Sequence, residues 1–402
     1  MPPSHILVAC HAWYDDMTGG AFRLASEFAI DLAHRGHIVS YVCCAAPGKE
    51  DLPSQEMCKG VRVHRYRPAK PNTNRLRRLN HHVQHTRQLV TQIDETTPIS
   101  AISSHSPLQG LGAAKAISHQ NNIFINYTVH SPFDDEILSN VEGPIGLATR
   151  FAAWMAGRVD RRNCVLADRV QTDSNYTLSR FIDKYGEVAK SKGVVAPGWV
   201  ETETFQPVPD RGVMRSHIGA DWQTDDPIFF TLRRLERRMG LDTLIEACAL
   251  LREKKCRFHV LIGGSGPLQS ELQSQIDALE LSDCVRLLGR LPEEHLHLAY
   301  AAADCFVLPT RALECFGLIV LEAFACNTPV IASNAAAIPE LATQQGNGWM
   351  FPPGDTHELA DRMERFLTGE MLPCNNLREL ALNYDRQRII SRWIELLGSD
   401  HK

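Results

Sequence analysis

Short apolar runs alternate with longer amphipathic stretches along the whole chain. In the first half, HILVAC precedes GGAFRLASEFAIDLAHRG and HIVSYVCC; in the second half, RFHVLIG precedes PLQSELQSQIDALEL and CVRLLG, and CFVLP precedes GLIVLEAFAC. Apolar runs that alternate with helical segments are typical of parallel strands whose sheet is covered by helices on both faces. The pattern therefore predicts an α/β fold.

The alternation breaks once, between Pro197 and Pro227. The residues there, PGWVETETFQPVPDRGVMRSHIGADWQTDDP, are rich in proline, glycine and charged side chains, as linkers between domains are. We predict two Rossmann-like, doubly wound parallel-sheet domains at residues 1–198 and 227–375, with a linker at 199–226. The helical segment at 376–402 contains Trp393, so we expect it to pack back on the domains.

Open α/β sheets bind their ligands at the carboxyl ends of the strands. Two such domains are expected to face a central cleft with these ends. We therefore expect the functional residues in loops that follow strands.

Composition narrows the class of protein. The chain has 402 residues, of which 44% are hydrophobic and 22% charged, and its formal net charge is -5. These values favour a globular protein over a nucleic-acid binder or a disordered chain. No apolar run approaches the roughly 20 residues of a membrane span, and no cationic flank precedes the first strand, so we expect a cytoplasmic protein. The 12 cysteines form no C-x-x-C pair, which favours reduced thiols over a zinc site or disulfides.

Two kinds of loop in the first half carry candidate residues. Thr18, Gly19 and Gly20 open a helix after the first strand, and paired glycines there either let the backbone approach an anion or form a plain turn. His130 follows the strand in INYTVHSPF, and His105 ends another strand in SSHSPLQG. Each imidazole either faces the cleft or is a packing residue that forms hydrogen bonds.

The second half supplies cations. TLRRLERRMGLDTLIEA places four arginines between a strand and a helix: Arg233, Arg234, Arg237 and Arg238. Such a run fits a solvated face, but its position after an apolar strand also suits guanidiniums that bind a diphosphate. Gly264 follows the strand in LIGGSGPLQ, but Gln269 stands where the third glycine of a dinucleotide fingerprint would be. Nicotinamide or flavin binding therefore loses its best support in the sequence.

Glu314 and Glu322 lie eight positions apart in TRALECFGLIVLEAFACNTPVIAS. A helix that begins near Leu318 would offer a phosphate its first backbone amides, those of Phe316, Gly317, Leu318 and Ile319. Glu322 would lie roughly 6 Å further along the axis, where it could accept hydrogen bonds from a ribose. Glu314 would reach the hydroxyls of a sugar on the other side, so the two glutamates would bracket a nucleoside diphosphate sugar. Either one alone also fits a surface or helix-start carboxylate.

The same stretch resembles a known family. ECFGLIVLE matches the E-x7-E signature of family 4 glycosyltransferases of GT-B fold, and EAFACNTPVIAS continues the match. Further matches follow in the order of that family over nearly the whole chain: TGGAFRLASEFAIDLAHRGHIV, YTVHSP, ADRVQTDSNYTLSRF, VVAPGWVETETFQP, RRLERRMGLDTLIEAC, GGSGPLQSEL, VRLLGRLP and AADCFVLPT.

The resemblance implies roles for individual residues. Gly20, beside Gly19, would approach the phosphate and sugar of the donor, and His130 would reach the transferred sugar. Arg234 and a basic partner would hold the diphosphate. Glu314 and the backbone of Phe316, Gly317 and Leu318 would bind the sugar and phosphate, Glu322 would bind the ribose, and Arg290 and Leu291 would contact the base, together with Gly289.

The sequence departs from the family pattern in three segments. Met239 stands where the family usually has lysine, and we expect Arg238 to take over that lysine's work. Asn327 replaces a common glycine, and asparagine tolerates positive φ better than most residues. SNAAAIPEL replaces family glycines near Ala336 and Ala337, which would narrow the sugar pocket or alter its preference.

The resemblance implies transfer of a sugar with retention of its anomeric configuration, from a UDP-, GDP- or ADP-sugar to an unidentified acceptor. We expect no metal or other cofactor, because arginines and helix-start amides would neutralise the leaving group and no D-x-D motif is present. The alternatives are an epimerase or phosphorylase of the same fold, and a non-catalytic nucleotide-sugar binding subunit.

A basic segment runs from Arg65 to Arg87, RYRPAKPNTNRLRRLNHHVQHTR, and contains no acidic residue. It fits a solvated loop and helix, an anionic acceptor, or peripheral contact with an anionic membrane surface.

Overall fold

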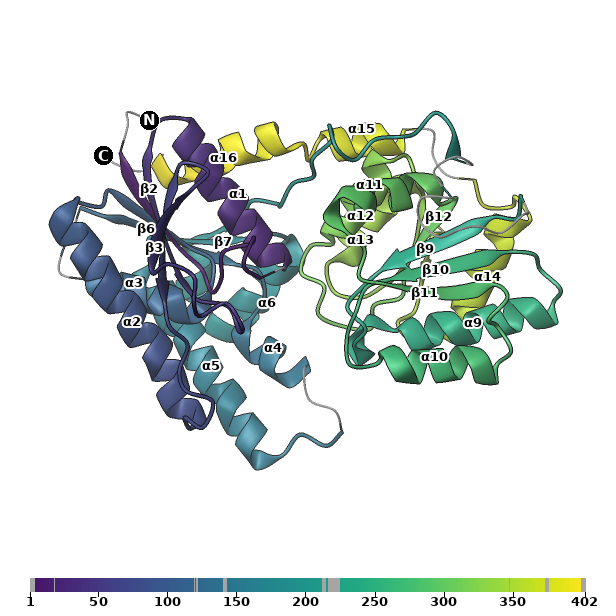
Figure 1. The fold of residues 1–402 in the computed structure, drawn as a ribbon, viewed down its shortest axis with the longest axis horizontal. Helices are drawn as coiled ribbons and strands as arrows, with labels where there is room; N and C mark the ends of the chain where they lie inside the picture. The colour runs from purple at the N-terminus through teal and green to yellow at the C-terminus, as the bar shows by residue number, and fades with distance from the viewer. Residues whose placement is uncertain are drawn as a thin grey trace. The chain divides into compact units, whose positions relative to one another are not determined.

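A computed structural model describes residues 4–17, 19–118, 120, 122–139, 143–211, 215, 225–346, 348–372 and 376–398. The chain divides into two compact units (Figure 1). Unit 1 comprises Met1–Gly198 and Ile389–Lys402, and unit 2 comprises Trp199–Arg388. Each unit is an α/β body with its own sheet, which confirms the predicted fold class. They are described separately below.

Unit 1 is built on a sheet whose strands have the order β3-β4-β2-β1-β5-β6-β7-β8. The strands are β1 (His5–Ala9), β2 (Ile38–Cys44), β3 (Gln55–Cys58), β4 (Val61–Tyr66), β5 (Ala101–Ser104), β6 (Phe124–Val129), β7 (Arg169–Thr172) and β8 (Gly193–Val195). All neighbours pair in parallel except β3 and β4, which form an antiparallel hairpin at the sheet edge. The turn between these two strands is too short for the crossover that parallel strands require.

The helices of unit 1 lie between its strands. They are α1 (Gly20–His34), α2 (Arg75–Thr96), α3 (Pro107–Ala116), α4 (Phe133–Ser139), α5 (Leu147–Leu166), α6 (Asn175–Tyr185) and α7 (Glu187–Lys190). The alternation of strand and helix follows the sequence pattern closely, because the central strands β1, β5 and β6 are buried on both faces.

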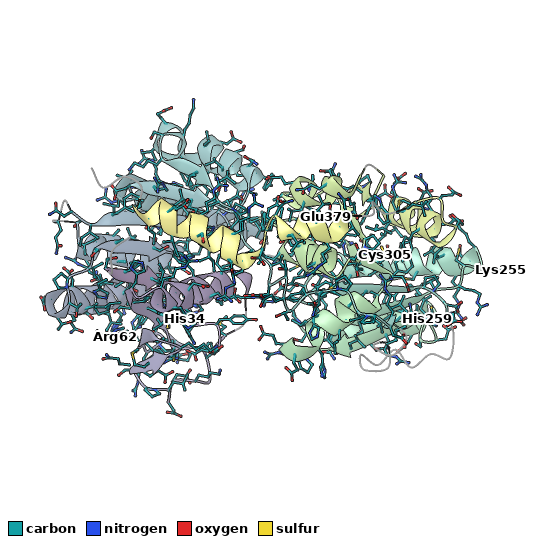
Figure 2. All side chains as sticks on the ribbon, turned by 90° about the horizontal axis from the view of Figure 1, so that it is seen from above. His34, Arg62, Lys255, His259, Cys305 and Glu379 are labelled. Atoms are coloured by element: carbon teal, nitrogen blue, oxygen red, sulfur yellow. The ribbon has the colours of Figure 1, made fainter. Side chains whose placement is uncertain are left out.

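The last helix, α16 (Arg386–Gly398), lies along unit 1 (Figure 2). Its Trp393 is 1% exposed. The indole lies 5.5 Å from the ring of Phe28 and 5.8 Å from that of His105, measured between ring centroids, and its Nε1 donates to Pro197 O at 2.9 Å. Unit 1 is thus completed by residues that are remote from it in the sequence.

Unit 2 has a fully parallel sheet of order β11-β10-β9-β12-β13-β14. Its strands are β9 (Ile228–Leu232), β10 (His259–Gly263), β11 (Val285–Gly289), β12 (Cys305–Leu308), β13 (Val330–Ser333) and β14 (Met350–Phe351). The helical segments are η1 (Arg237–Met239), α9 (Leu241–Glu253), α10 (Gln269–Ala278), α11 (Glu293–Ala302), α12 (Leu318–Ala325), α13 (Ile338–Ala342), η2 (Thr343–Gln345), α14 (Thr356–Leu367) and α15 (Leu377–Leu382).

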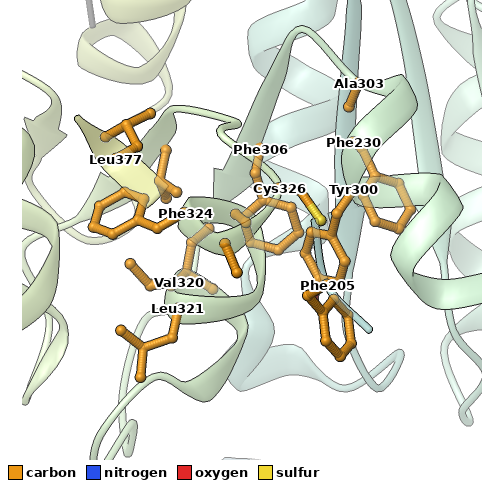
Figure 3. Packing of buried hydrophobic residues seen from close by; sticks show 14 of the residues in the cluster. Phe205, Phe230, Tyr300, Ala303, Phe306, Val320, Leu321, Phe324, Cys326 and Leu377 are labelled. Carbon is orange, nitrogen blue, oxygen red and sulfur yellow. The ribbon is translucent and has the colours of Figure 1, made fainter. Parts of the chain in front are cut away.

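The linker predicted at 199–226 is wrong for its first residues. Val200 and Phe205 are 1% and 4% exposed and belong to the hydrophobic core of unit 2, where Phe205 contacts Tyr300 (Figure 3). Proline and charged residues around these side chains made the segment resemble a solvated connection. Residues 212–214 and 216–224 of the predicted linker lie outside the described residues.

Candidate active site

Most of the predicted donor residues lie at one edge of the unit 2 sheet. Since all its strands are parallel, their carboxyl ends meet at that edge, and the strand order reverses between β9 and β12, where such sheets bind ligands. Arg233 and Arg234 follow β9, Gly264 follows β10, Arg290 follows β11, and the loop with Glu314 follows β12.

Glu314 forms an ion pair with Arg233. Arg233 Nη2 donates to Glu314 Oε2 at 2.8 Å, and the two side chains are only 8% and 18% exposed. The same Nη2 lies 2.9 Å from Met239 Sδ. Among the described residues, the buried Nε of Arg233 has no hydrogen-bond partner. This guanidinium therefore has donor capacity left for a second anion, such as a diphosphate oxygen.

Arg238 lies beside this ion pair. Its Nη1 donates to Leu313 O at 3.3 Å, and its Nε lies 3.5 Å from Glu236 Oε2. Burial, and after it the charge of Arg233, lowers the pKa of the Arg238 guanidinium. An anion bound between the two cations would relieve both effects. Arg234, in contrast, has a side chain that is 73% exposed and pairs with Glu236 at 2.9 Å.

Gly264 fixes the backbone at Arg233. Its φ is +124°, and a Cβ on it would lie 1.8 Å from Arg233 O. Gly240, the residue before α9, has a φ of +69°, and a Cβ there would lie 2.0 Å from Pro309 O. Only glycine fits such contacts. Gly264 therefore has a structural role whether or not it also contacts a ligand.

The loop from Glu314 leads into α12, which begins at Leu318 as predicted. Gly317, the residue before the helix, has a φ of +94°, and Leu313 has a φ of +58°, which is unusual for a side chain of this size. Glu314 O accepts a hydrogen bond from Ala337 N at 2.9 Å. The carboxylate is thus held by a backbone with two left-handed residues near it.

The other residues predicted at this helix start differ in burial. Phe316 is 7% exposed and belongs to the hydrophobic core, and Leu318 and Ile319 are partly buried against that core. Two of the departures from the family pattern have positive φ, with Asn327 at +57° and Ala336 at +51°. The asparagine keeps a backbone suited to glycine, as we predicted.

Glu322 lies in the second turn of α12 and is 6% exposed. Burial, and after it the Glu322 carboxylate, raises the pKa of Tyr300 well above its ordinary value. The Glu322 carboxylate therefore lies near the Tyr300 hydroxyl. A ribose bound by Glu322 would share the carboxylate with this hydroxyl. Gly264 N donates to Gly289 O at 2.7 Å, so the predicted base loop, with exposed Arg290 and half-buried Leu291, lies next to Gly264.

In unit 1, His130 follows β6 and belongs to a chain of hydrogen bonds. Its Nδ1 donates to Asp173 Oδ2 at 2.8 Å, and its Nε2 lies 3.2 Å from His105 Nδ1. His105 Nε2 in turn lies 3.0 Å from Ser103 Oγ. Burial, and after it the charge of His130, lowers the pKa of His105 well below its ordinary value. Because the carboxylate can only accept, His130 carries its proton on Nδ1, and neutral His105 donates to His130 Nε2.

Both ring nitrogens of His130 are therefore engaged, and an imidazole that binds a sugar must give up its contact with His105. Sequence reasoning missed Asp173. A signal existed, because Asp173 directly follows β7, the strand beside β6, and so ends at the same sheet edge as His130. Sequence reasoning also missed the pairing of Arg233 with Glu314, for which the sequence held no signal beyond the arginine run.

Gly19 and Gly20 stand at the start of α1. Gly19 precedes the helix in an extended conformation, and Gly20 is its first residue. Thr18 lies outside the described residues. The two glycines belong to unit 1, whereas Arg238 and Glu314 belong to unit 2.

The basic segment differs from the prediction at its first residue. Arg65 has a side chain that is 2% exposed and is bound at 2.6 Å by Asp16 and at 3.1 Å by Glu56. This arginine is a structural ion-pair partner and is not available to a ligand. Among the side chains of the segment that the structure describes, the exposed cations are Arg67, Lys70, Arg77, Arg78 and Arg87. Within the described part of the chain, no helix is both long and apolar enough to span a bilayer.

Two family models match the chain in sequence. "Glycosyltransferase Family 4" matches residues 18–204, and "Glycosyl transferases group 1" matches residues 216–387. Among curated relatives, the putative colanic acid biosynthesis glycosyltransferase WcaL of Salmonella typhimurium is 30% identical over 67% of this chain and 72% of its own length. A GDP-mannose-dependent alpha-(1-6)-phosphatidylinositol monomannoside mannosyltransferase of Mycolicibacterium smegmatis is 35% identical over 43% of this chain.

The match to several relatives is partial. The chain spans 46% of the length of that mannosyltransferase, and 36% of the amylovoran biosynthesis glycosyltransferase AmsK of Erwinia amylovora. Two solved structures share the fold over 98% of this chain: a sucrose-phosphate synthase from Thermosynechococcus elongatus, with a TM-score of 0.80 and 21% identity, and Anabaena HepE in complex with UDP and glucose, with a TM-score of 0.75 and 20% identity. With its two parallel-sheet units and its sequence matches in both, this chain belongs to the family 4 glycosyltransferases of GT-B fold.

Proposed function

We propose that this glycosyltransferase takes its sugar from a nucleotide-sugar donor, which unit 2 binds, and transfers it with retention of the anomeric configuration. One observation carries the proposal. Glu314 meets two guanidiniums, the buried one of Arg233 and the partly buried one of Arg238, at the carboxyl edge of a parallel sheet.

This arrangement suits a departing nucleoside diphosphate. As the bond to the sugar breaks, negative charge develops on the diphosphate, and the guanidiniums and the first amides of α12 would stabilise that charge. A diphosphate would also compete for Arg233, which would free the Glu314 carboxylate to accept hydrogen bonds from sugar hydroxyls. Since the cations are protein groups, we propose that transfer needs no metal ion.

Relatives suggest which donors to test. The names of several relatives specify GDP-mannose, and HepE has been crystallised with UDP and with UDP-glucose. The acceptor is proposed only as a hydroxyl of a glycan or glycolipid, since relatives are named for amylovoran, colanic acid and phosphatidylinositol mannoside.

The direct test is incubation of the purified protein with GDP-mannose, UDP-glucose and ADP-glucose, with and without chelator. We expect slow release of nucleoside diphosphate from one donor, unchanged by EDTA. With an acceptor hydroxyl supplied, the one-bond carbon–proton coupling at C1 of the transferred sugar should show the donor's anomeric configuration. An epimerised donor, or binding with no release, would instead support the two alternative functions. Strict dependence on Mg²⁺ or Mn²⁺ would contradict the proposal that arginines and backbone amides neutralise the diphosphate.

A matched pair of variants tests the two glutamates. Glu314→Gln should lower turnover more than tenfold while free nucleoside diphosphate still binds, because it weakens charge-assisted bonds to the sugar. Glu322→Gln should mainly weaken binding of the free nucleotide. Titration calorimetry with the nucleoside diphosphate distinguishes the two variants. Equal losses of affinity would show that the sugar-binding role of Glu314 and the ribose-binding role of Glu322 are wrongly assigned.

A further inference from the structure

Helix α5 exposes three large apolar side chains on one face. Leu147, Phe151 and Trp154 are 85%, 52% and 55% exposed. Their spacing of four and three residues places them on the same side of the helix. The Phe151 and Trp154 rings stack, with centroids 5.7 Å apart and an angle of 30° between their planes. The opposite face of α5 packs on unit 1 with small side chains such as Ala152 and Ala156.

Arginines surround this apolar stripe. Arg150, Arg158, Arg161 and Arg162 of α5 are all exposed, and the Arg158 guanidinium lies 5.0 Å from the centroid of the Trp154 ring. The one acidic residue of α5, Asp160, is fully buried and accepts hydrogen bonds from Tyr127 and from the amide of Phe133. The exposed face of this helix therefore carries four positive charges and no negative one.

A second element of unit 1 has the same character. In the first turn of α2, Leu76 is 52% exposed and is followed by exposed Arg77 and Arg78. Cations at the start of a helix are disfavoured by the helix dipole, so these arginines do not stabilise α2. In Figure 1 the first turns of α2 and α5 both lie toward the lower end of unit 1.

We propose that the α5 face, defined as Leu147, Phe151 and Trp154 with the four arginines of α5, binds the surface of a bilayer that contains anionic lipid. Clustered exposed apolar side chains mark interaction sites. An anionic bilayer combines a negative surface with an apolar interior, so it complements the arginines and the apolar stripe at once. Arginine stems reach the headgroups while the rings enter the interface.

A second copy of the chain fits this face poorly. A two-fold contact is formed by the same patch on both partners, so each group of four arginines would meet another such group. The like charges would repel, and the described residues of α5 offer no exposed carboxylate to offset them. The charge pattern therefore favours lipid over a homodimer.

Vesicle sedimentation with the full chain tests the proposal. We expect binding to vesicles of phosphatidylcholine mixed with phosphatidylglycerol, little binding to phosphatidylcholine alone, and release at high salt. The triple variant Leu147→Ser, Phe151→Ser, Trp154→Ser should lose this binding. Replacing Arg150, Arg161 and Arg162 by glutamine should weaken it by roughly a hundredfold, since each arginine at an anionic surface contributes about fivefold.

Matched controls distinguish vesicle binding by the α5 face from non-specific adsorption through other exposed apolar side chains. Met57→Ser and Leu372→Ser remove side chains that are 63% and 78% exposed elsewhere, and both variants should bind as the unchanged protein does. Circular dichroism should show all variants folded, because substitutions of exposed side chains rarely alter stability much. Vesicle binding that survives the triple variant, or a dimer seen by light scattering that this variant abolishes, would overturn the proposal.

Discussion

At the scale of single residues, the position of Arg233 depends on contacts that lie far apart in the sequence. The segment between β9 and α9 is irregular and has one turn of 3₁₀ helix, so no periodicity tells which of its arginines turns inward. The close approach of Gly264 and the carboxylate of Glu314 determine it. The sequence could place Glu314 and the start of α12, which depend on local pattern, but it could not choose among the arginines.

We predict that Arg233 is the cation most needed for turnover. Arg233→Ala should lower kcat/KM by an amount that corresponds to about 2–5 kcal/mol of lost transition-state stabilisation, because it also leaves the partly buried Glu314 carboxylate without its partner. Adding Met239→Lys should restore part of the loss, since Arg233 Nη2 contacts the sulfur of that residue. Steady-state kinetics with the active donor measures both effects.

Arg237→Ala is the control for this experiment, because Arg237 belongs to the same run but forms an exposed ion pair with Glu271. It should leave kcat/KM unchanged. If Arg238→Ala abolishes activity while Arg233→Ala is tolerated, the expectation drawn from the sequence is right and the present assignment to Arg233 is not.

At the scale of elements, the alternation of strands and helices was predictable because each element shows its burial in its own composition. The pairing between strands was less predictable from the sequence. The antiparallel hairpin of β3 and β4 and the packing of Phe205 in unit 2 depend on partners remote in sequence or on a turn that leaves no strong signal. The burial of Arg65 could not be predicted for the same reason, since its carboxylate partners include Asp16, far earlier in the chain.

Helix α16 gives a prediction at this scale. Trp393→Ala should destabilise unit 1 by about 3–5 kcal/mol, because it leaves a cavity beside Phe28 and His105 and removes a hydrogen bond to Pro197. Urea unfolding followed by circular dichroism measures the loss. Glu395→Ala, on the exposed side of the same helix, should change stability little. Equal effects of the two substitutions would mean that α16 contributes little to the core of unit 1.

At the scale of the whole molecule, the two units differ in their histidines. Burial lowers the pKa of seven described histidines in unit 1, namely His5, His11, His37, His64, His82, His85 and His105, and in unit 2 that of His259. For His82 the value is about 4. Because the unfolded chain binds these protons near pH 6.5, stability falls as the pH drops below that value, by at most about 1.4 kcal/mol per pH unit for each fully buried imidazole.

Asp160 opposes this trend in unit 1. Burial raises its pKa to about 7, so it binds a proton in the folded state first and adds stability as the pH falls from 7 toward 4. One carboxyl is outweighed by several imidazoles. We predict that acidification from pH 7 to pH 5 lowers the melting temperature of unit 1 more than that of unit 2. Calorimetry, with hydrogen exchange to assign the transitions, measures the difference, and equal shifts would refute it.

The division of unit 1 between the two ends of the chain has a consequence for biosynthesis. Unit 2 is continuous in sequence, so it can close its core as soon as its last residue has been made. Unit 1 is synthesised first, yet its core lacks Trp393 until all of unit 2 has followed. Domains commonly fold in the order of synthesis. In this protein we expect the order to be reversed, so that unit 2 completes its core before unit 1 does. While unit 2 is translated, the surface of unit 1 that binds α16, at Phe28 and His105, would stay uncovered.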